Sequence, residues 1–216
     1  MTKPETQAVI FDLDGLLIDS EIVWNTVRAE IAAQRGVVWT EADHRAVMGV
    51  STAEWVAYMI ERLELDLGPA EVQELVSSRM VASYRERIPL KPGAMELVHK
   101  VGEHLPVGLA SGSVRNLIDI VISAPEFAGR FRAVVSADEV GRGKPHPDVY
   151  LETARRLVVA PEACVCLEDS GHGIDAGKAA GMRVIAVPDP RFMPEAATLA
   201  RADVVVDSLT EVTLEM

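Results

Sequence analysis

The sequence predicts an α/β fold, in which a parallel sheet has helices on both faces and a helical segment is inserted near its start. After residue 92, short β-branched and apolar runs alternate with helical patterns, which is typical of parallel strands joined by helices. Between residues 20 and 87 the pattern is helical throughout, yet a short buried strand precedes it. Because that strand belongs to the later sheet, the helical segment is predicted to be an insertion.

The composition is that of a globular protein, and it limits the partners. The chain has 216 residues, 49% of them hydrophobic and 25% charged, with a formal net charge of -12. This balance suits a sizeable core but disfavours nucleic-acid binding, because phosphate backbones recruit basic patches. The start lacks a signal-peptide pattern, and no apolar run approaches the ~20 residues of a membrane helix. We expect a cytoplasmic monomer with no nucleic-acid or membrane partner.

The first strand is predicted over residues 7–11, and the inserted segment that follows it contains four helices. Apolar residues at helical spacing, together with cap and stop residues, place these helices over residues 21–35, from Thr40, from Ser51, and from Pro69 to about residue 87. The corresponding domains are residues 1–16 with 90–216 for the α/β part and residues 17–89 for the helical part.

Five further strands complete the predicted sheet, over residues 107–110, 133–135, 164–167, 184–187 and 204–206. Helices are expected between them, over residues 94–100, after Ser113, over residues 147–157, and from Ser170 to a stop at Gly181. The two cysteines, Cys164 and Cys166, lie two residues apart in one strand, roughly 6.6 Å along it, where a disulfide would be strained. We interpret them as small buried residues.

Polar residues follow the predicted strands at four places: Asp12-Leu13-Asp14-Gly15, Ser111-Gly112-Ser113, Gly143-Lys144-Pro145-His146-Pro147-Asp148 and Glu168-Asp169. In open parallel sheets, ligands bind beyond the carboxyl ends of the strands, so all four are expected at one edge. Paired carboxylates disfavour each other's ionisation unless a cation is near. Hard oxygen ligands suit Mg²⁺, and a serine with free amides at a helix start suits a phosphate.

Each of these four elements also has a plainer interpretation when it stands alone. The paired aspartates resemble a cap, the Ser-Gly-Ser sequence a turn, and the lysine a solvated loop residue. The Glu-Asp pair is ordinary acid at a helix start, where the helix dipole favours it. The occurrence of all four in this order, at successive strand ends, favours a single site.

Together these motifs resemble the haloacid dehalogenase-like superfamily, in its phosphatase and phosphomutase branch with a helical cap inserted after the first strand. The motifs that carry the resemblance are Asp12-Leu13-Asp14-Gly15-Leu16-Leu17-Ile18-Asp19-Ser20, Ala110-Ser111-Gly112-Ser113, Gly143-Lys144-Pro145, and Glu168-Asp169-Ser170 with Gly173-Ile174. The resemblance covers nearly the whole chain. It implies a Rossmann-like core with a four-helix cap, whose two linkers, residues 16–20 and 88–92, act as hinges.

The resemblance also implies roles for the polar residues in phosphoryl transfer. Asp12 is expected to be the nucleophile that forms an aspartyl-phosphate, and Asp14 the acid and base. Ser111, the Gly112 amide and Lys144 are expected to bind the phosphoryl group and neutralise its charge.

For the metal, the resemblance implies Mg²⁺ held by the Asp12 carboxylate, the Asp14 backbone carbonyl and Asp169. Glu168 is expected to support these ligands. In the cap, Trp24, Met48 and Val50 are candidates for substrate specificity, although packing within the cap explains them equally well.

Departures from other members of this superfamily favour phosphate-ester hydrolysis. The aspartate at position 14 favours phosphate-ester chemistry over dehalogenation. The cap histidine and arginine of β-phosphoglucomutases are replaced by Trp24 and Thr52, and threonine cannot supply an arginine fork for a second phosphate. We therefore expect a Mg²⁺-dependent phosphatase acting on a small phosphorylated metabolite, a sugar phosphate. The alternatives are a β-phosphoglucomutase-type isomerase and a non-catalytic protein that binds a phosphorylated metabolite.

Overall fold

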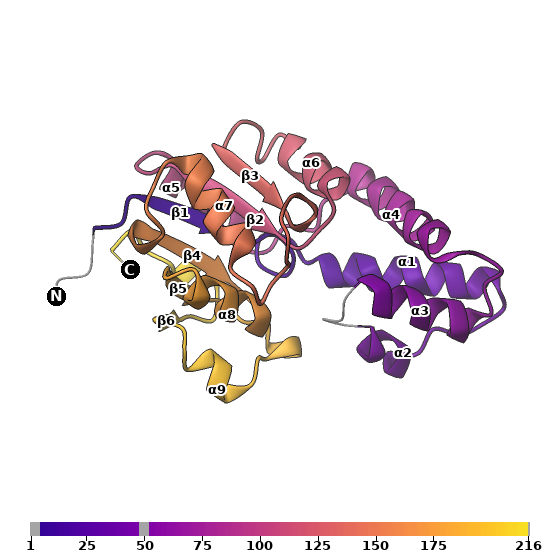
Figure 1. Ribbon diagram of the computed structural model, residues 1–216. Helices are drawn as coiled ribbons and strands as arrows, with labels where there is room; N and C mark the ends of the chain where they lie inside the picture. The colour runs from indigo at the N-terminus through magenta and orange to yellow at the C-terminus, as the bar shows by residue number, and fades with distance from the viewer. Residues whose placement is uncertain (1–4, 48–51, 216) are drawn as a thin grey trace. The chain divides into compact units, whose positions relative to one another are not determined.

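The computed structural model describes residues 5–47 and 52–215, and the chain in it divides into two compact units (Figure 1). The core unit comprises Met1–Asp19 and Pro89–Met216, and the helical unit comprises Ser20–Ile88. The capping-box residue Ser51 and the specificity candidates Met48 and Val50 lie outside the described residues. No helix in the described part of the chain is long and apolar enough to cross a membrane.

The core unit is built on a six-stranded sheet in which every pairing is parallel. The strands are β1 (Ala8–Phe11), β2 (Val107–Ser111), β3 (Ala133–Ser136), β4 (Cys164–Glu168), β5 (Arg183–Ala186) and β6 (Val204–Val205). Their order is β3-β2-β1-β4-β5-β6, so the chain reverses its direction of strand addition beside β1. The predicted fold class is confirmed, and the strand boundaries agree to within one residue.

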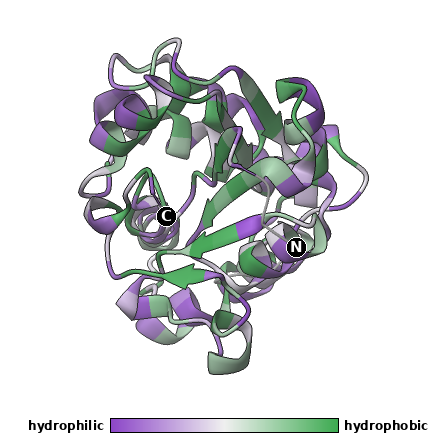
Figure 2. Cartoon of the chain, turned by 90° about the vertical axis from the view of Figure 1, so that its left-hand side faces the viewer, coloured by the Kyte–Doolittle hydropathy of each residue, from purple (hydrophilic) through white to green (hydrophobic). Residues whose placement is uncertain are grey.

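The central strands are hydrophobic on both sides because helices cover both faces of the sheet (Figure 2). Ile10 of β1 pairs with Cys166 of β4 and belongs to a buried cluster with residues of α7 and α8. Its neighbours in sequence point the other way, as strand alternation requires, towards α5 and the C-terminal segment. Both cysteines are buried and free, as the sequence predicts.

Five α-helices are described in the core unit: α5 (Ala94–Gly102), α6 (Arg115–Ser123), α7 (Asp148–Leu157), α8 (Gly171–Ala179) and α9 (Ala196–Leu199). Short 3-10 turns lie at Ala137–Glu139, Pro161–Ala163, Pro190–Phe192 and Leu209–Glu211. The start of α8 is capped by the Ser170 hydroxyl, which accepts a hydrogen bond from the Gly173 amide at 3.1 Å. Helix α9 has four residues, too few to show the periodicity on which the sequence prediction depends.

The helical unit contains the four predicted helices: α1 (Ser20–Gln34), α2 (Glu41–Ala46), α3 (Thr52–Leu63) and α4 (Pro69–Glu86). Thr40 and Asp43 form a reciprocal capping box at the start of α2, and Pro69 opens α4. Helix α4 packs against α1 and α3 through buried residues that include Val76 and Met80.

The two chain segments that join the units run side by side within the core unit. Ile18 forms an antiparallel bridge with Leu90, and the Asp19 amide donates to the Pro89 carbonyl at 2.7 Å. This pairing brings together the ends of both linkers, whose hinge motion stays a prediction.

Candidate active site

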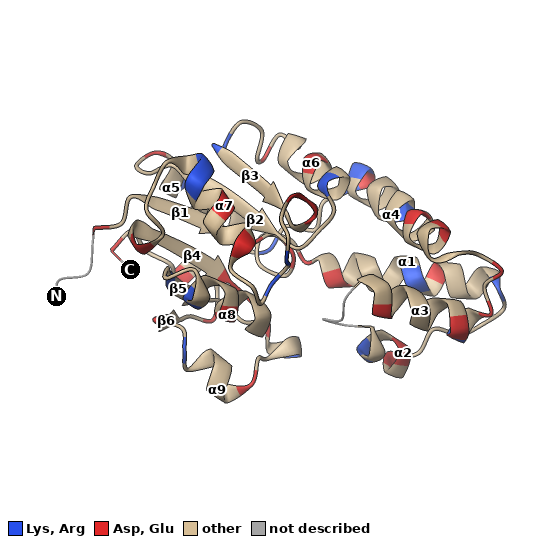
Figure 3. Ribbon diagram, in the orientation of Figure 1, with Lys and Arg blue, Asp and Glu red and all other residues tan. Residues whose placement is uncertain are grey.

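The predicted site residues gather where β1, β2 and β4 end, beside the strand at which the sheet reverses its order. Such a switch point is where open α/β sheets bind their ligands. Charged residues are scarce within the strands, where Glu168 and Arg183 are the charged members, and gather on helices and loops (Figure 3). Asp12 follows β1, Ser111 ends β2, and Glu168 ends β4.

Asp12 and Glu168 share one lysine. The Lys144 ammonium donates to Oδ1 of Asp12 at 2.5 Å and to Oε1 of Glu168 at 2.5 Å. Its third hydrogen bond, at 3.1 Å, goes to the Ala110 carbonyl of β2. Because 132 residues separate Lys144 from Asp12 in sequence, this contact depends on the sheet bringing their loops together.

Asp14 is held by two serines, one at the end of β2 and one just after it. Ser111 Oγ donates to Asp14 Oδ2 at 3.0 Å, and Ser113 Oγ donates to the same oxygen at 2.7 Å. The Ser113 amide donates to Ser111 Oγ at 2.9 Å, so Ser111 is itself oriented. Ser136 ends β3, and its Oγ anchors this turn by donating to the Ser113 carbonyl at 2.7 Å.

The site also holds a cluster of three carboxylates that could bind a metal ion. One oxygen from each of Asp12, Glu168 and Asp169 lies within 4.8 Å of the others. Gly15 leaves room for the third: its φ is +81°, and a Cβ there would lie 2.0 Å from Asp169 Oδ2. Oxygen donors in this number, converging in a largely buried place, fit a hard divalent cation such as Mg²⁺.

The electrostatics of the metal-free cluster favour the same conclusion. Burial raises the pKa of Asp12 to about 8; Lys144 opposes the rise, while Glu168 and Asp14 add to it. Burial and the charges of Asp12 and Glu168 also raise the pKa of Asp169 well above its usual value. One lysine therefore does not balance the negative charge of the clustered carboxylates, and a further cation would stabilise them.

Lys144 is held in this cluster by two carboxylates. Burial by itself lowers the pKa of its ammonium, but attraction by Asp12 and Glu168 outweighs burial and raises that pKa above its usual value. Lys144 therefore stays protonated at neutral pH. It can neutralise negative charge but cannot serve as a base.

The structure brings together most of the residues that the sequence predicts for the site: Asp12, Asp14, Ser111, Lys144, Glu168 and Asp169. Gly112 is exposed beside Ser111, with open space where a Cβ would stand, so its backbone is accessible. In the helical unit, Trp24 contacts the Trp55 ring, with centroids 5.9 Å apart, and lies 5.0 Å from the Arg28 guanidinium. These contacts are packing within the helical unit, and a part of Trp24 in substrate specificity stays a prediction.

Two residues near the site were not assigned by the sequence interpretation. Ser113 lies within a quoted motif, and its hydroxyl at the second position after Ser111 is the feature that could have identified it. Tyr150 carries no such feature, because it occupies an apolar position of α7 and its hydroxyl reaches Glu168 only in the folded chain.

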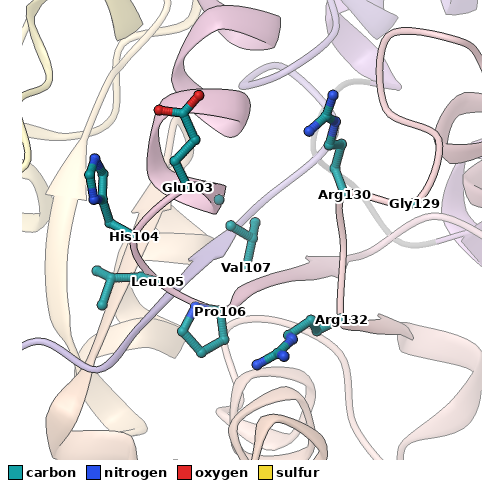
Figure 4. Close-up of a pocket in the computed structure, with 9 residues that line it drawn as sticks. Glu103, His104, Leu105, Pro106, Val107, Gly129, Arg130 and Arg132 are labelled. Atoms are coloured by element: carbon teal, nitrogen blue, oxygen red, sulfur yellow. The ribbon is translucent and has the colours of Figure 1, made fainter.

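A separate pocket lies at the opposite edge of the sheet, where β2 begins. It has a volume of about 340 Å³ and is lined by Glu103, His104, Arg130, Arg132 and their neighbours. The side chains of Arg130 and Arg132 point away from each other (Figure 4). None of the site residues lines this pocket. They gather at the carboxyl ends of the strands, where we place the candidate active site.

Comparison with known proteins identifies the family. A family model described as haloacid dehalogenase-like hydrolase matches residues 9–187. Hexitol phosphatase B of Escherichia coli (strain K12) is 39% identical over 222 residues, covering 98% of this chain and 96% of that protein.

Solved structures agree with this match. A CbbY variant from Rhodobacter sphaeroides in complex with xylulose-(1,5)bisphosphate has a TM-score of 0.82 and 27% identity, covering 95% of this chain and 96% of its own. β-Phosphoglucomutase from Clostridium difficile has a TM-score of 0.79 and 25% identity, covering 97% and 94%. The four motifs, the parallel sheet and these relatives lead to one conclusion: the chain belongs to the haloacid dehalogenase-like hydrolase family.

Proposed function

We propose that this hydrolase is a Mg²⁺-dependent phosphatase that cleaves a small phosphorylated sugar or polyol through an aspartyl-phosphate. The observation that carries the proposal is the position of Asp12. Its carboxylate lies in contact with the Lys144 ammonium and in one cluster with Asp169, while Ser111, at the end of the adjoining strand, donates a hydrogen bond to Asp14. A nucleophile, a charge-neutralising lysine and an acid are the groups that this chemistry requires.

In the proposed first step, an oxygen of Asp12 attacks phosphorus and the bond from phosphorus to the sugar oxygen breaks. Asp14 donates a proton to that departing oxygen, so that it leaves as an alcohol. Ser111 donates a hydrogen bond to a phosphoryl oxygen and orients the group for attack, while the Lys144 ammonium neutralises negative charge between Asp12 and the phosphoryl group.

In the second step, Asp14 removes a proton from water, which attacks the phosphorus of the aspartyl-phosphate and releases inorganic phosphate. Asp12 is regenerated as a carboxylate, so the enzyme returns to its starting state. Asp12, Asp169 and the Asp14 carbonyl would hold Mg²⁺, with Glu168 in support. The ion, when bound, neutralises charge on the phosphoryl oxygens.

The substrate class rests on relatives that match over 83% or more of their own length. These include the hexitol phosphatase, a phosphorylated carbohydrates phosphatase of Thermotoga maritima and the CbbY complex with a sugar bisphosphate. We also propose that the helical unit is the cap of this enzyme, with the domain boundaries given by residues 17–89, and that Trp24, Met48 and Val50 contribute to its specificity.

Turnover of p-nitrophenyl phosphate with Mg²⁺, followed by a panel of hexose and hexitol phosphates, tests the proposal. We expect Asp12→Asn to lower kcat by about three orders of magnitude or more, because the nucleophile is lost. Asp119→Asn on α6, where the carboxylate is half-exposed and pairs with Arg115, is the matched control and should keep wild-type activity.

Two results would contradict the proposed function. Phosphate release that is unaffected by Asp12→Asn would remove Asp12 from the reaction. Conversion of β-glucose 1-phosphate to glucose 6-phosphate without net phosphate release would instead assign the chain to the mutases, with which it shares its fold.

A further inference from the structure

Tyr150 on α7 is a buried side chain that contacts the site from beneath. Its relative exposure is 0%, and its hydroxyl donates to Glu168 Oε1 at 2.5 Å. Its ring lies 5.0 Å from the Lys144 ammonium. Tyr150 thus touches both members of the pair formed by Lys144 and Glu168, and none of the steps proposed above uses it.

The Lys144 ammonium has no donor to spare in this arrangement. It carries three N–H groups, and three acceptors receive them: Asp12 Oδ1, Glu168 Oε1 and the Ala110 carbonyl. The direction in which the ammonium points therefore depends on how strongly each acceptor attracts it. Two of the acceptors are carboxylates at the same distance of 2.5 Å, so a change in the charge of either one shifts the position of the ammonium.

Tyr150 acts on Glu168 and changes how strongly this acceptor attracts Lys144. Oε1 of Glu168 receives both the Lys144 ammonium and the Tyr150 hydroxyl, and Oε2 receives Ser170 Oγ at 3.2 Å. The carboxyl group lies close against Gly173, where an added Cβ would stand only 1.8 Å from Glu168 Cδ, and this close approach limits how far the group can turn. A neutral donor on Oε1 spreads the negative charge of this oxygen and weakens its attraction for the lysine.

We propose that Tyr150 is a positioning residue, whose hydroxyl occupies Glu168 Oε1 and thereby keeps the Lys144 ammonium directed at Asp12. The proposal rests on the phosphatase function proposed above, since it concerns the lysine assigned to the phosphoryl group there. When the hydroxyl is removed, the full charge of Oε1 faces Lys144. The ammonium then moves towards Glu168 and away from the place where the phosphoryl group is transferred.

The test is Tyr150→Phe, which removes the hydroxyl and keeps the ring beneath Lys144. We expect kcat to fall roughly tenfold, as for other partners that orient site carboxylates, with KM changed by less than about twofold. A residue that only supports the fold would instead lower the amount of folded enzyme and leave kcat per folded molecule unchanged.

Tyr58→Phe is the matched control. The Tyr58 hydroxyl donates to a buried carboxylate as well, Asp43 Oδ1 at 2.7 Å, but within the helical unit. Both substitutions remove one hydroxyl from one carboxylate, so a similar loss of thermal stability is expected from each. We expect only Tyr150→Phe to lower kcat; an equal effect of the two on kcat would overturn the proposal.

A double-mutant cycle identifies the route of the effect. In the Glu168→Gln background the 168 side chain no longer attracts Lys144 through a full charge, so adding Tyr150→Phe should cost less than about twofold in kcat. An undiminished tenfold loss in that background would mean that Tyr150 does not act through Glu168, and the proposal would fall.

A crystal structure of the metal-free Tyr150→Phe protein gives a readout that does not depend on activity. We expect the contact between Lys144 Nζ and Asp12 Oδ1 to lengthen beyond about 3.5 Å, the limit of a hydrogen bond. An unchanged contact would refute the positioning role. If the wild-type protein hydrolyses no phosphate ester, the proposed function fails, while this structure still decides whether Tyr150 directs the lysine.

Discussion

Each unit of the molecule buries an aspartate, and the two are stabilised in opposite ways. Asp43 in the helical unit accepts hydrogen bonds from Arg62 and Tyr58 at 2.7 Å and from the Thr40 amide at 2.8 Å. Burial by itself raises its pKa, but the bonds from Arg62 and Thr40 outweigh burial and hold that pKa well below the usual range. The ionised form of Asp43 is therefore fully stabilised by the groups around it.

Asp12 in the core unit has the opposite balance. Among the described residues it has one cationic partner, which it shares with Glu168, and Asp169 lies in the same cluster. Its pKa is raised to about 8, first by burial and then by its carboxylate neighbours. The comparison teaches that burial alone does not distinguish a structural carboxylate from one in the candidate active site. What distinguishes them is whether the surrounding hydrogen-bond donors and cations stabilise the negative charge of the carboxylate.

Among the changes that test this comparison, the largest effect is expected from Lys144→Met, which removes the shared cation. The carboxylates of Asp12 and Glu168 would then face each other without the ammonium between them. We expect kcat to fall by about two to three orders of magnitude, and the metal-free protein to lose roughly 3 kcal/mol in its free energy of unfolding. Steady-state kinetics and urea unfolding measure the two quantities.

Lys178→Met is the control for this prediction, because Lys178 also forms an ion pair in the core unit, with Asp203 at 2.7 Å, away from the cluster. It should leave kcat unchanged. If Lys144→Met kept more than about a tenth of the wild-type kcat, Lys144 would have no part in stabilising the transferred phosphoryl group.

The reverse pattern is expected when the carboxylate of the helical unit is removed. Asp43→Ala deletes the acceptor of the Thr40 capping box and of Tyr58, which should cost about 2 kcal/mol in the free energy of unfolding. The kcat of the protein that remains folded should stay at the wild-type value. A tenfold fall in kcat without a fall in stability would show that the two aspartates do not differ as described.

The smallest effect concerns the pH dependence of stability. The pKa of Asp12 is raised on folding, from 3.8 to about 8, so the folded state binds this proton more tightly than the unfolded state does. The free energy of unfolding of the metal-free protein should therefore fall as the pH rises through this interval. We expect Tm to drop by roughly several degrees between pH 6 and pH 8, and Mg²⁺ to restore it at pH 8.

Asp12→Asn should flatten this dependence, because its amide does not titrate; a slope as steep as in the wild type would assign the effect to other groups. Asp43 contributes with the opposite sign. Its pKa is lowered on folding, so its stabilising contribution is present above its unfolded pKa of 3.8 and is lost as the pH falls further.

The sequence by itself determined the fold class and most of the candidate site, for a local reason. Buried parallel strands are short apolar runs, and the residue at the end of each run necessarily lies at the carboxyl edge of the sheet. Asp12, Ser111 and Glu168 could therefore be placed at one edge without knowing any distance. The helices of both units, apart from the short α9, were predicted in the same way, from periodicity and capping residues.

Only the tertiary structure decided which partners these residues have. The sharing of Lys144 between Asp12 and Glu168 joins three separate loops and strands, and the Tyr150 hydroxyl reaches Glu168 from a helix whose sequence pattern calls only for an apolar residue. A hydrogen bond is directional and depends on the packing of whole elements, whereas hydrophobic periodicity depends on neighbours in the chain. For that reason the location of the site followed from sequence, while the balance of charges within it required the folded chain.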